Sequence, residues 1–261
     1  HTISYSLTGV QTCALPISTF SLVLAAALTA LFAGCSGLPP NRPPAASRTA
    51  ALDRALEPVR ATHAPDPHLG LFHVGVACRG DTLVLTGEVA SASARADALA
   101  AARAAGLEVD DRIAVLPDPA LGEATWGLVC LSVVTGREQP EHKAEVGTQE
   151  LMGCSVRIWK HSGIWSLVQT ADRYVSWMEE GSFQRCTASD VEAWNRSALL
   201  MVTAFEDRVL ERPDPGAQPV SDVVMGCLVR ALGETGDWYR VDLPDHRSGY
   251  LPRKADRKSV V

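Results

Sequence analysis

A tripeptide that occurs twice is the feature that most limits how this chain can fold. Met152-Gly153-Cys154 returns as Met225-Gly226-Cys227, 73 residues further along. Other residues match at the same offset or near it: Trp165 with Trp238, Val168 with Val241 and, if three residues are inserted in the intervening hairpin, Tyr174 with Tyr250. Several matches at one offset indicate an internal repeat. We therefore expect one small fold to be present twice.

Each copy has the same predicted order of strands. A first strand, at residues 129–140 or 199–214, leads into a long polar loop, and an apolar strand follows the tripeptide. A turn containing Gly then precedes a strand that carries a Trp, and a last strand closes the copy. Five short strands with Gly, Pro and Asp at the turns predict a small closed or half-closed barrel. Between the copies, the Ser-x-x-Glu pattern at 189–192 is typical of a capping box and predicts a short helix from Asp190 to Arg196.

The segment before the repeat predicts a small α+β unit. Residues 50–59 can form a short amphipathic helix. Apolar residues alternate over 72–78, and a second strand at 82–89 follows a short turn, which predicts a hairpin. The Ala-rich residues 91–106 end in Gly and predict a helix, and residues 112–117 predict a third strand. The order of the main elements is ββαβ.

Composition and charge exclude several functions. With 46% hydrophobic and 21% charged residues the chain is globular, and its net charge of −6 with scattered basic residues argues against a nucleic-acid-binding surface. Apart from Cys13 and Cys35 near the start, five cysteines remain, an odd number without any Cys-x-x-Cys pattern. This argues against a complete disulfide framework and a zinc site, so we interpret these cysteines as small buried hydrophobes and expect no metal or cofactor.

The two ends of the chain need a separate interpretation. Residues 1–18 and 256–261 resemble translated sequencing adapter; the alternative is ordinary disordered termini. The uninterrupted apolar run at 19–32 is short for a membrane span, which needs about 20 residues, but suits a signal peptide. Small residues directly before Cys35 resemble a bacterial lipobox, which implies a lipidated Cys35 and an exported, membrane-anchored lipoprotein at the bacterial cell envelope. The alternative is plain secretion with cleavage nearby. The Pro-rich residues 36–49 predict a semi-rigid tether.

The strand order and several phrases of the repeat resemble known families. The Gly-x-Trp before the third strand and the ending Gly249-Tyr250-Leu251-Pro252 are similar to bacterial SH3 domains. The phrases GREQP, WSLVQT, EAWNRS and GDWYRVDLPD resemble the tandem SH3 pair in front of the catalytic domain of NlpC-type cysteine peptidases, which cut γ-D-glutamyl-diamino acid bonds in peptidoglycan. The ββαβ segment resembles the small BON-type domains of bacterial envelope proteins.

These resemblances imply a fold class and a division into domains. The expected fold is mainly β: two small SH3-like β-barrels in tandem, preceded by a small α+β BON-like domain. The expected parts are adapter residues 1–18, a lipoprotein signal peptide 19–35, a Pro-rich tether 36–49, a BON-like domain 50–117, a first bacterial SH3 domain 118–186, a linker helix 187–197, a second SH3 domain 198–255, and adapter residues 256–261.

The resemblance also bears on catalysis. The catalytic domain of that family carries an Asp-Cys-Ser-Gly nucleophile motif with a downstream His, because a thiolate needs an imidazole partner. Cys-Ser occurs here only at Cys35 and Cys154, and His161 is the imidazole nearest to Cys154 in the sequence, on a turn expected to face solvent. We therefore expect no catalytic residue in this chain, which ends where the peptidase domain of the family would begin.

The remaining expectation is a binding function. The chain is predicted to be an envelope lipoprotein fragment whose SH3 pair binds or positions peptidoglycan peptides; the alternative is the front part of a γ-D-glutamyl-diamino acid endopeptidase whose catalytic domain is missing. Trp165, Trp238 and Trp194 are interpreted as packing residues. The candidate ligand contacts are exposed aromatics, with two arginines as anchors for peptide carboxylates: Trp159, Trp177, Tyr239, Arg137 and Arg212.

Overall fold

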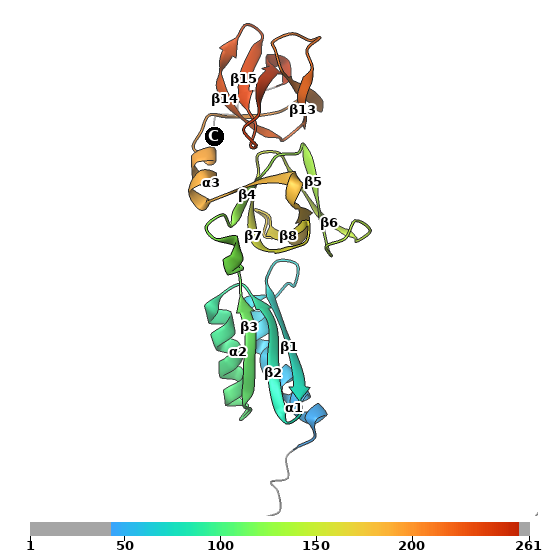
Figure 1. Ribbon diagram of the computed structural model, residues 1–261, viewed down its shortest axis with the longest axis vertical. Helices are drawn as coiled ribbons and strands as arrows, with labels where there is room; N and C mark the ends of the chain where they lie inside the picture. The colour runs from blue at the N-terminus through green and yellow to red at the C-terminus, as the bar shows by residue number, and fades with distance from the viewer. Residues whose placement is uncertain (1–42, 256–261) are drawn as a thin grey trace, which may run out of the picture. The chain divides into compact units, whose positions relative to one another are not determined.

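The structure is a computed structural model that describes residues 43–255 (Figure 1). The described part is mainly β, as predicted. The residues interpreted as adapter, the signal peptide, Cys35 and the first part of the tether lie outside the described residues. None of the helices in the described range has the length and apolar character needed to cross a bilayer.

An α+β domain comes first in the described chain. Its elements are α1 (Ala45–His63), β1 (Phe72–Arg79), β2 (Thr82–Val89), α2 (Ala92–Ala104) and β3 (Val109–Val115). β2 is the central strand, antiparallel to β1 and parallel to β3, so the predicted ββαβ order is confirmed. Helix α1 is longer than the predicted 50–59, because the good helix formers on both sides extend it. It therefore includes residues 45–49, which the sequence predicts as the end of the tether.

Small side chains let α2 lie close to this sheet. Ala94, Ala98 and Ala102 recur at the i, i+4 spacing of one helix face and are buried in a core with apolar residues of α1 and all three strands. The side chain of Ser91 caps the helix by accepting a hydrogen bond from the Ala94 backbone N–H. Gly106, with φ of 70°, ends it.

Two barrels and a linking helix follow. The strands of the first are β4 (Trp126–Val129), β5 (Val133–Arg137), β6 (Val146–Leu151), β7 (Ser155–Ser162), β8 (Trp165–Gln169), β9 (Val175–Glu179) and β10 (Phe183–Cys186). Helix α3 (Ala188–Asn195) then leads to β11 (Leu199–Met201), β12 (Glu206–Leu210), β13 (Pro219–Val224), β14 (Leu228–Thr235), β15 (Trp238–Asp242) and β16 (Ser248–Pro252). The strand orders are β10-β4-β7-β8-β9-β5-β6 and β11-β14-β15-β16-β12-β13.

The structure confirms the repeat and makes it more regular than predicted. Strands β5 to β9 recur as β12 to β16 with the same lengths, each 73 residues later. The three-residue insertion that we placed between Tyr174 and Tyr250 is wrong. Tyr250 pairs across the sheet with Leu210, as Trp177 pairs with Arg137, so the counterpart of Tyr250 is Trp177.

Two strands occupy the segments that we predicted to be long polar loops. β6 and β13 lie at the edges of their sheets, and most of their residues remain partly exposed. The sequence does not predict these strands, because an edge strand buries little surface and its residues can therefore be mostly polar. The predicted first strand of the second copy, 199–214, is in fact two strands, β11 and β12, and that of the first copy, 129–140, contains β5 and only the last residue of β4.

Helix α3 and its N-cap begin two residues earlier than predicted. Thr187, not Ser189, is the N-cap: its Oγ1 accepts from the Asp190 N–H at 3.2 Å, and the Asp190 carboxylate accepts from the Thr187 N–H at 2.9 Å. The predicted packing role of Trp194 is confirmed, since it is buried and its Nε1 donates to the Gly153 carbonyl oxygen at 3.0 Å.

The two copies of the tripeptide have different surroundings. Met152 of the first barrel is fully buried within the hydrophobic core of the second barrel, and its carbonyl oxygen accepts from the Leu228 N–H at 2.9 Å. A side chain at Gly153, whose φ is 86°, would clash with the Leu228 carbonyl, so only Gly permits this approach. Met225, in contrast, is 56% exposed. Both tripeptides lie where the barrels meet, since Cys227 Sγ donates to the Ser132 carbonyl oxygen at 3.4 Å, but only the first inserts its Met side chain into the core of the other barrel.

Candidate functional site

A row of side chains crosses three neighbouring strands of the first barrel. Arg157 on β7 lies opposite Trp126 of β4 on one side and opposite Gln169 of β8 on the other. The alternation of β7 buries Val156 and Ile158 in the barrel core, which turns Arg157 to the outer surface. Trp159 follows at a β-bulge, where the pairing with β8 shifts register.

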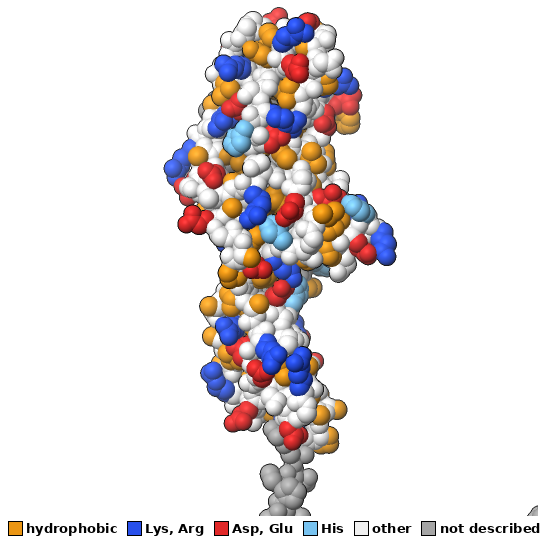
Figure 2. All heavy atoms as spheres, in the orientation of Figure 1, with side chains coloured by type: hydrophobic (Ala, Val, Ile, Leu, Met, Phe, Trp, Pro, Cys, Tyr) orange, Lys and Arg blue, Asp and Glu red, His pale blue; other side chains and the backbone are white. Residues whose placement is uncertain are grey.

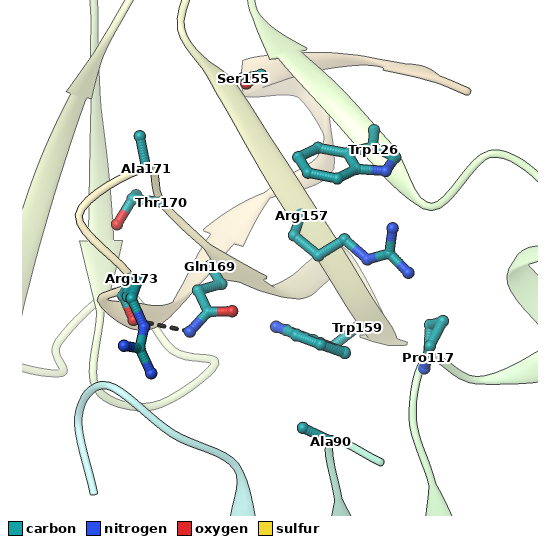
Figure 3. A pocket seen from close by; sticks show the side chains of 10 residues that line it. All are labelled: Ala90, Pro117, Trp126, Ser155, Arg157, Trp159, Gln169, Thr170, Ala171 and Arg173. Atoms are coloured by element: carbon teal, nitrogen blue, oxygen red, sulfur yellow. Dashed lines mark hydrogen bonds between the residues drawn. The ribbon is translucent and has the colours of Figure 1, made fainter. Parts of the chain in front are cut away.

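These side chains line a pocket of about 560 Å³ (Figure 3). The guanidinium carbon of Arg157 lies 5.1 Å from the ring centroid of Trp126 and 5.6 Å from that of Trp159, so the cation is held between two indoles. Gln169 is fixed at the side of the pocket, because its Nε2 donates to the carbonyl oxygens of Leu69 and Arg173. The complete lining is Ala90, Pro117, Trp126, Ser155, Arg157, Trp159, Gln169, Thr170, Ala171 and Arg173.

The pocket is positively charged in a chain that is negative overall. Its lining contains Arg157 and Arg173 and no acidic residue. Within residues 43–255, the Arg157 guanidinium forms no ion pair, and burial alone lowers the pKa of this group. The indole N–H groups of Trp126 and Trp159 are buried without an acceptor among the described residues. Such unsatisfied groups are rare in native proteins, which makes this pocket the candidate binding site.

The structure brings only some of the predicted contact residues together. Trp159 lines the pocket, and Trp177 lies half-buried in the same apolar cluster, with the Lys160 Nζ 5.4 Å from its ring centroid. The prediction of an exposed Tyr239 is wrong. That side chain points inward from β15 into the core of the second barrel and is only 5% exposed.

The two predicted anchors lie away from the pocket. Arg137 donates from Nη1 to the Ala144 carbonyl oxygen at 2.7 Å and so bridges the loop between β5 and β6. Arg212 is exposed in the loop between β12 and β13. Of the other two tryptophans interpreted as packing residues besides Trp194, Trp165 is buried and Trp238 is half-buried.

The surroundings of Cys154 disfavour a catalytic thiolate. Burial, followed by the nearby Glu150 carboxylate, raises the pKa of this thiol to about 12. The imidazole of His161 has other partners, because its Nδ1 lies 2.7 Å from Ser166 Oγ and 2.6 Å from a carboxylate oxygen of Glu180. Ser166 is itself fully buried and out of reach of a substrate.

Neither the grouping of metal-ligating side chains nor the distribution of charge on the face shown in Figure 2 marks out a second site in the described residues. In the part of the chain that the structure describes, no group of three or more His, Cys, Asp or Glu side chains is placed to hold a metal ion. On the face shown in Figure 2, acidic and basic side chains are interspersed over the surface.

Comparison with known proteins identifies part of the first barrel. Residues 136–183, from β5 to the start of β10, match the family described as the bacterial dipeptidyl-peptidase SH3 domain. The first barrel is thus similar to a bacterial SH3 domain. No curated protein matches the chain.

Several solved structures resemble about half of the chain. An NlpC/P60 family protein from Bacillus cereus is 17% identical with a TM-score of 0.43, covering 51% of this chain and 55% of that one. An NlpC/P60 endopeptidase from Photobacterium damselae is 13% identical with a TM-score of 0.37, covering 52% and 33%. NlpC2 from Trichomonas vaginalis is 13% identical with a TM-score of 0.22, covering 52% and 48%. The chain spans about half or less of the length of these proteins.

Proposed function

We propose that this protein is a cell-wall-binding module of the bacterial envelope and that the pocket at Arg157 is its ligand site. The match of residues 136–183 to a bacterial SH3 family carries the proposal, because it gives the barrel a bacterial recognition fold. The pocket on the same barrel supports it, since two indoles and an unpaired guanidinium are groups that bind peptides.

The proposed location is the bacterial cell envelope, where the exported protein is anchored to a membrane with Cys35 as the lipid attachment site. The apolar run at 19–32 and the small residues directly before Cys35 support it. Expression in a bacterium with a labelled fatty acid tests the anchor: the wild-type chain should take up the label, and a Cys35→Ala chain should not. Equal labelling of both would contradict the anchor.

A second role follows from the description of the matched family, which is named for a peptidase. In this second role the barrels position a γ-D-glutamyl-diamino acid endopeptidase domain encoded downstream of Lys254. The role is compatible with ligand binding. Reading the gene downstream of Lys254 tests it: an Asp-Cys-Ser-Gly motif is expected, and a stop codon without such a domain would contradict it.

Sedimentation with purified peptidoglycan sacculi tests the binding function. We expect the full chain to sediment with sacculi and a Trp159→Ala chain to sediment less, because that substitution removes one wall of the pocket. Leu232→Ala is the matched control, since Leu232 occupies the same repeat position in the second barrel and is exposed. Absence of sedimentation above background would overturn the proposal, and so would an equal loss for both variants.

A further inference from the structure

The second barrel shows what the pocket of the first barrel lacks. Arg230 on β14 is the repeat counterpart of Arg157 and lies opposite Asp242 of β15. Its Nη2 donates to Asp242 Oδ2 at 2.6 Å, and Ser248 donates to the other carboxylate oxygen at 2.6 Å. The second barrel therefore neutralises its arginine with a carboxylate from its own adjacent strand.

The first barrel has the arginine but not the carboxylate. The residue opposite Arg157 is Gln169, at the repeat position of Asp242. Its amide is neutral and is engaged with two backbone carbonyls. In place of the carboxylate, the first barrel has Trp126 and Trp159 around the cation, where the second barrel has Leu199 and Leu232.

An unpaired cation between two indoles favours an external anion. Partial burial removes water from the guanidinium, and within residues 43–255 no carboxylate compensates for that loss. A planar guanidinium binds a planar carboxylate through two parallel hydrogen bonds. Arg173 at the same pocket adds a second positive charge.

We propose that the pocket of the first barrel binds a carboxylate group of its ligand at Arg157, in the place that the Asp242 side chain has in the second barrel. Trp126 and Trp159 contact the apolar part of the ligand beside that carboxylate. The ligand class is a peptide with a free carboxylate, and this choice of a peptide rests on the proposed function.

A pair of matched peptides tests the inference on the full chain. The probes are an N-acetylated alanine dipeptide with a free C-terminus and the same dipeptide as its C-terminal amide. The readout is the indole N–H spectrum of the ¹⁵N-labelled chain, which has six tryptophans. The free acid should shift the signals of Trp126 and Trp159. The affinity of the amide should be lower by at least about tenfold, because the amide cannot form a charge-assisted pair with the guanidinium. Equal shifts with acid and amide would overturn the inference.

Substitutions in the two barrels complete the test. Gln169→Asp places a carboxylate opposite Arg157, so we expect it to reduce binding of the free acid about tenfold or more. Arg157→Gln removes the cation while leaving Gln169 in place and should have the same effect. Asp242→Gln is the control in the second barrel and should leave the Trp126 and Trp159 shifts unchanged. Free-acid binding that survives both Gln169→Asp and Arg157→Gln would refute the carboxylate site.

The experiment separates this inference from the function on which it rests. Sacculi that bind the wild-type chain and the Arg157→Gln chain equally would refute the carboxylate site and leave wall binding intact. A free acid that binds at Arg157, together with sacculi that do not bind, would refute wall binding and leave the carboxylate site intact.

Discussion

Replacement of Met152 by Ala should destabilise the second barrel, although Met152 belongs to the sequence of the first. The Met152 side chain is fully buried among apolar residues of the second barrel. Truncation to Ala removes that contact and leaves a cavity that the surrounding strands can only partly fill. Such a Met→Ala substitution costs about 2 to 5 kcal/mol of the free energy of unfolding. The same change at Met225, which is 56% exposed, should alter that free energy by about 0.5 kcal/mol or less.

Urea unfolding of the full chain measures both variants under identical conditions. Indole N–H signals report on each barrel separately, with Trp238 in the second barrel and Trp165 in the first. We expect Met152→Ala to lower the midpoint recorded at Trp238 and Met225→Ala to leave it near the wild-type value. The reasoning would be refuted if the two substitutions shifted that midpoint equally, or if Met152→Ala shifted only the midpoint at Trp165.

Two other predictions use the same repeat. Gly153→Ala should lower the free energy of unfolding by at least about 1 kcal/mol more than Gly226→Ala does. Both substitutions change a residue with positive φ, but only the first also places a Cβ against the backbone of the other barrel. Thermal unfolding of the two variants checks this, and equal midpoints would contradict it. Burial raises the pKa of the Asp242 carboxyl, but hydrogen bonds from Ser248 and Arg230 outweigh this effect, so the folded pKa is lowered. The resulting stability is complete above the unfolded pKa of about 3.9 and is lost as pH falls through the folded value. An Asp242→Asn chain should therefore lack that acid-dependent loss in unfolding midpoints measured from pH 6 to pH 2, and an unchanged profile would count against the ion pair.

Much of the fold was predictable from the sequence because local patterns agree with the tertiary structure. The hairpin of the α+β domain alternates apolar and polar residues, and α2 carries a cap at Ser91 and a terminating Gly106. The edge strands β6 and β13 were not predictable in this way. An edge strand takes its conformation from pairing with a neighbour, and a pattern of buried residues does not reveal that pairing.

The candidate site was less predictable, because its residues are informative only as a set. Trp159 was predicted as a contact, whereas Trp126 and Arg157 carry no local signal that distinguishes them from packing residues. Tyr239 was misplaced because polar loops near it suggested exposure, while the alternation of β15 turns it inward. A signal was nevertheless present in the sequence. At the 73-residue offset, an arginine is kept in both copies while its Asp partner in one copy is Gln169 in the other.

The regular offset shows how two copies of one fold can differ in their side chains while keeping the same strands. Because strands β5 to β9 and β12 to β16 have equal lengths and the same pairing order, differences between the barrels within these five strands lie in the side chains at matched positions. In the second barrel, Arg230 forms an ion pair with Asp242, and the core contains the Met152 side chain of the first barrel. The ion pair is internal to the second barrel, whereas the buried Met152 side chain ties the first barrel to the second. In the first barrel Arg157 lies between two indoles, and an internal ion pair there would neutralise the charge on which the proposed carboxylate site depends.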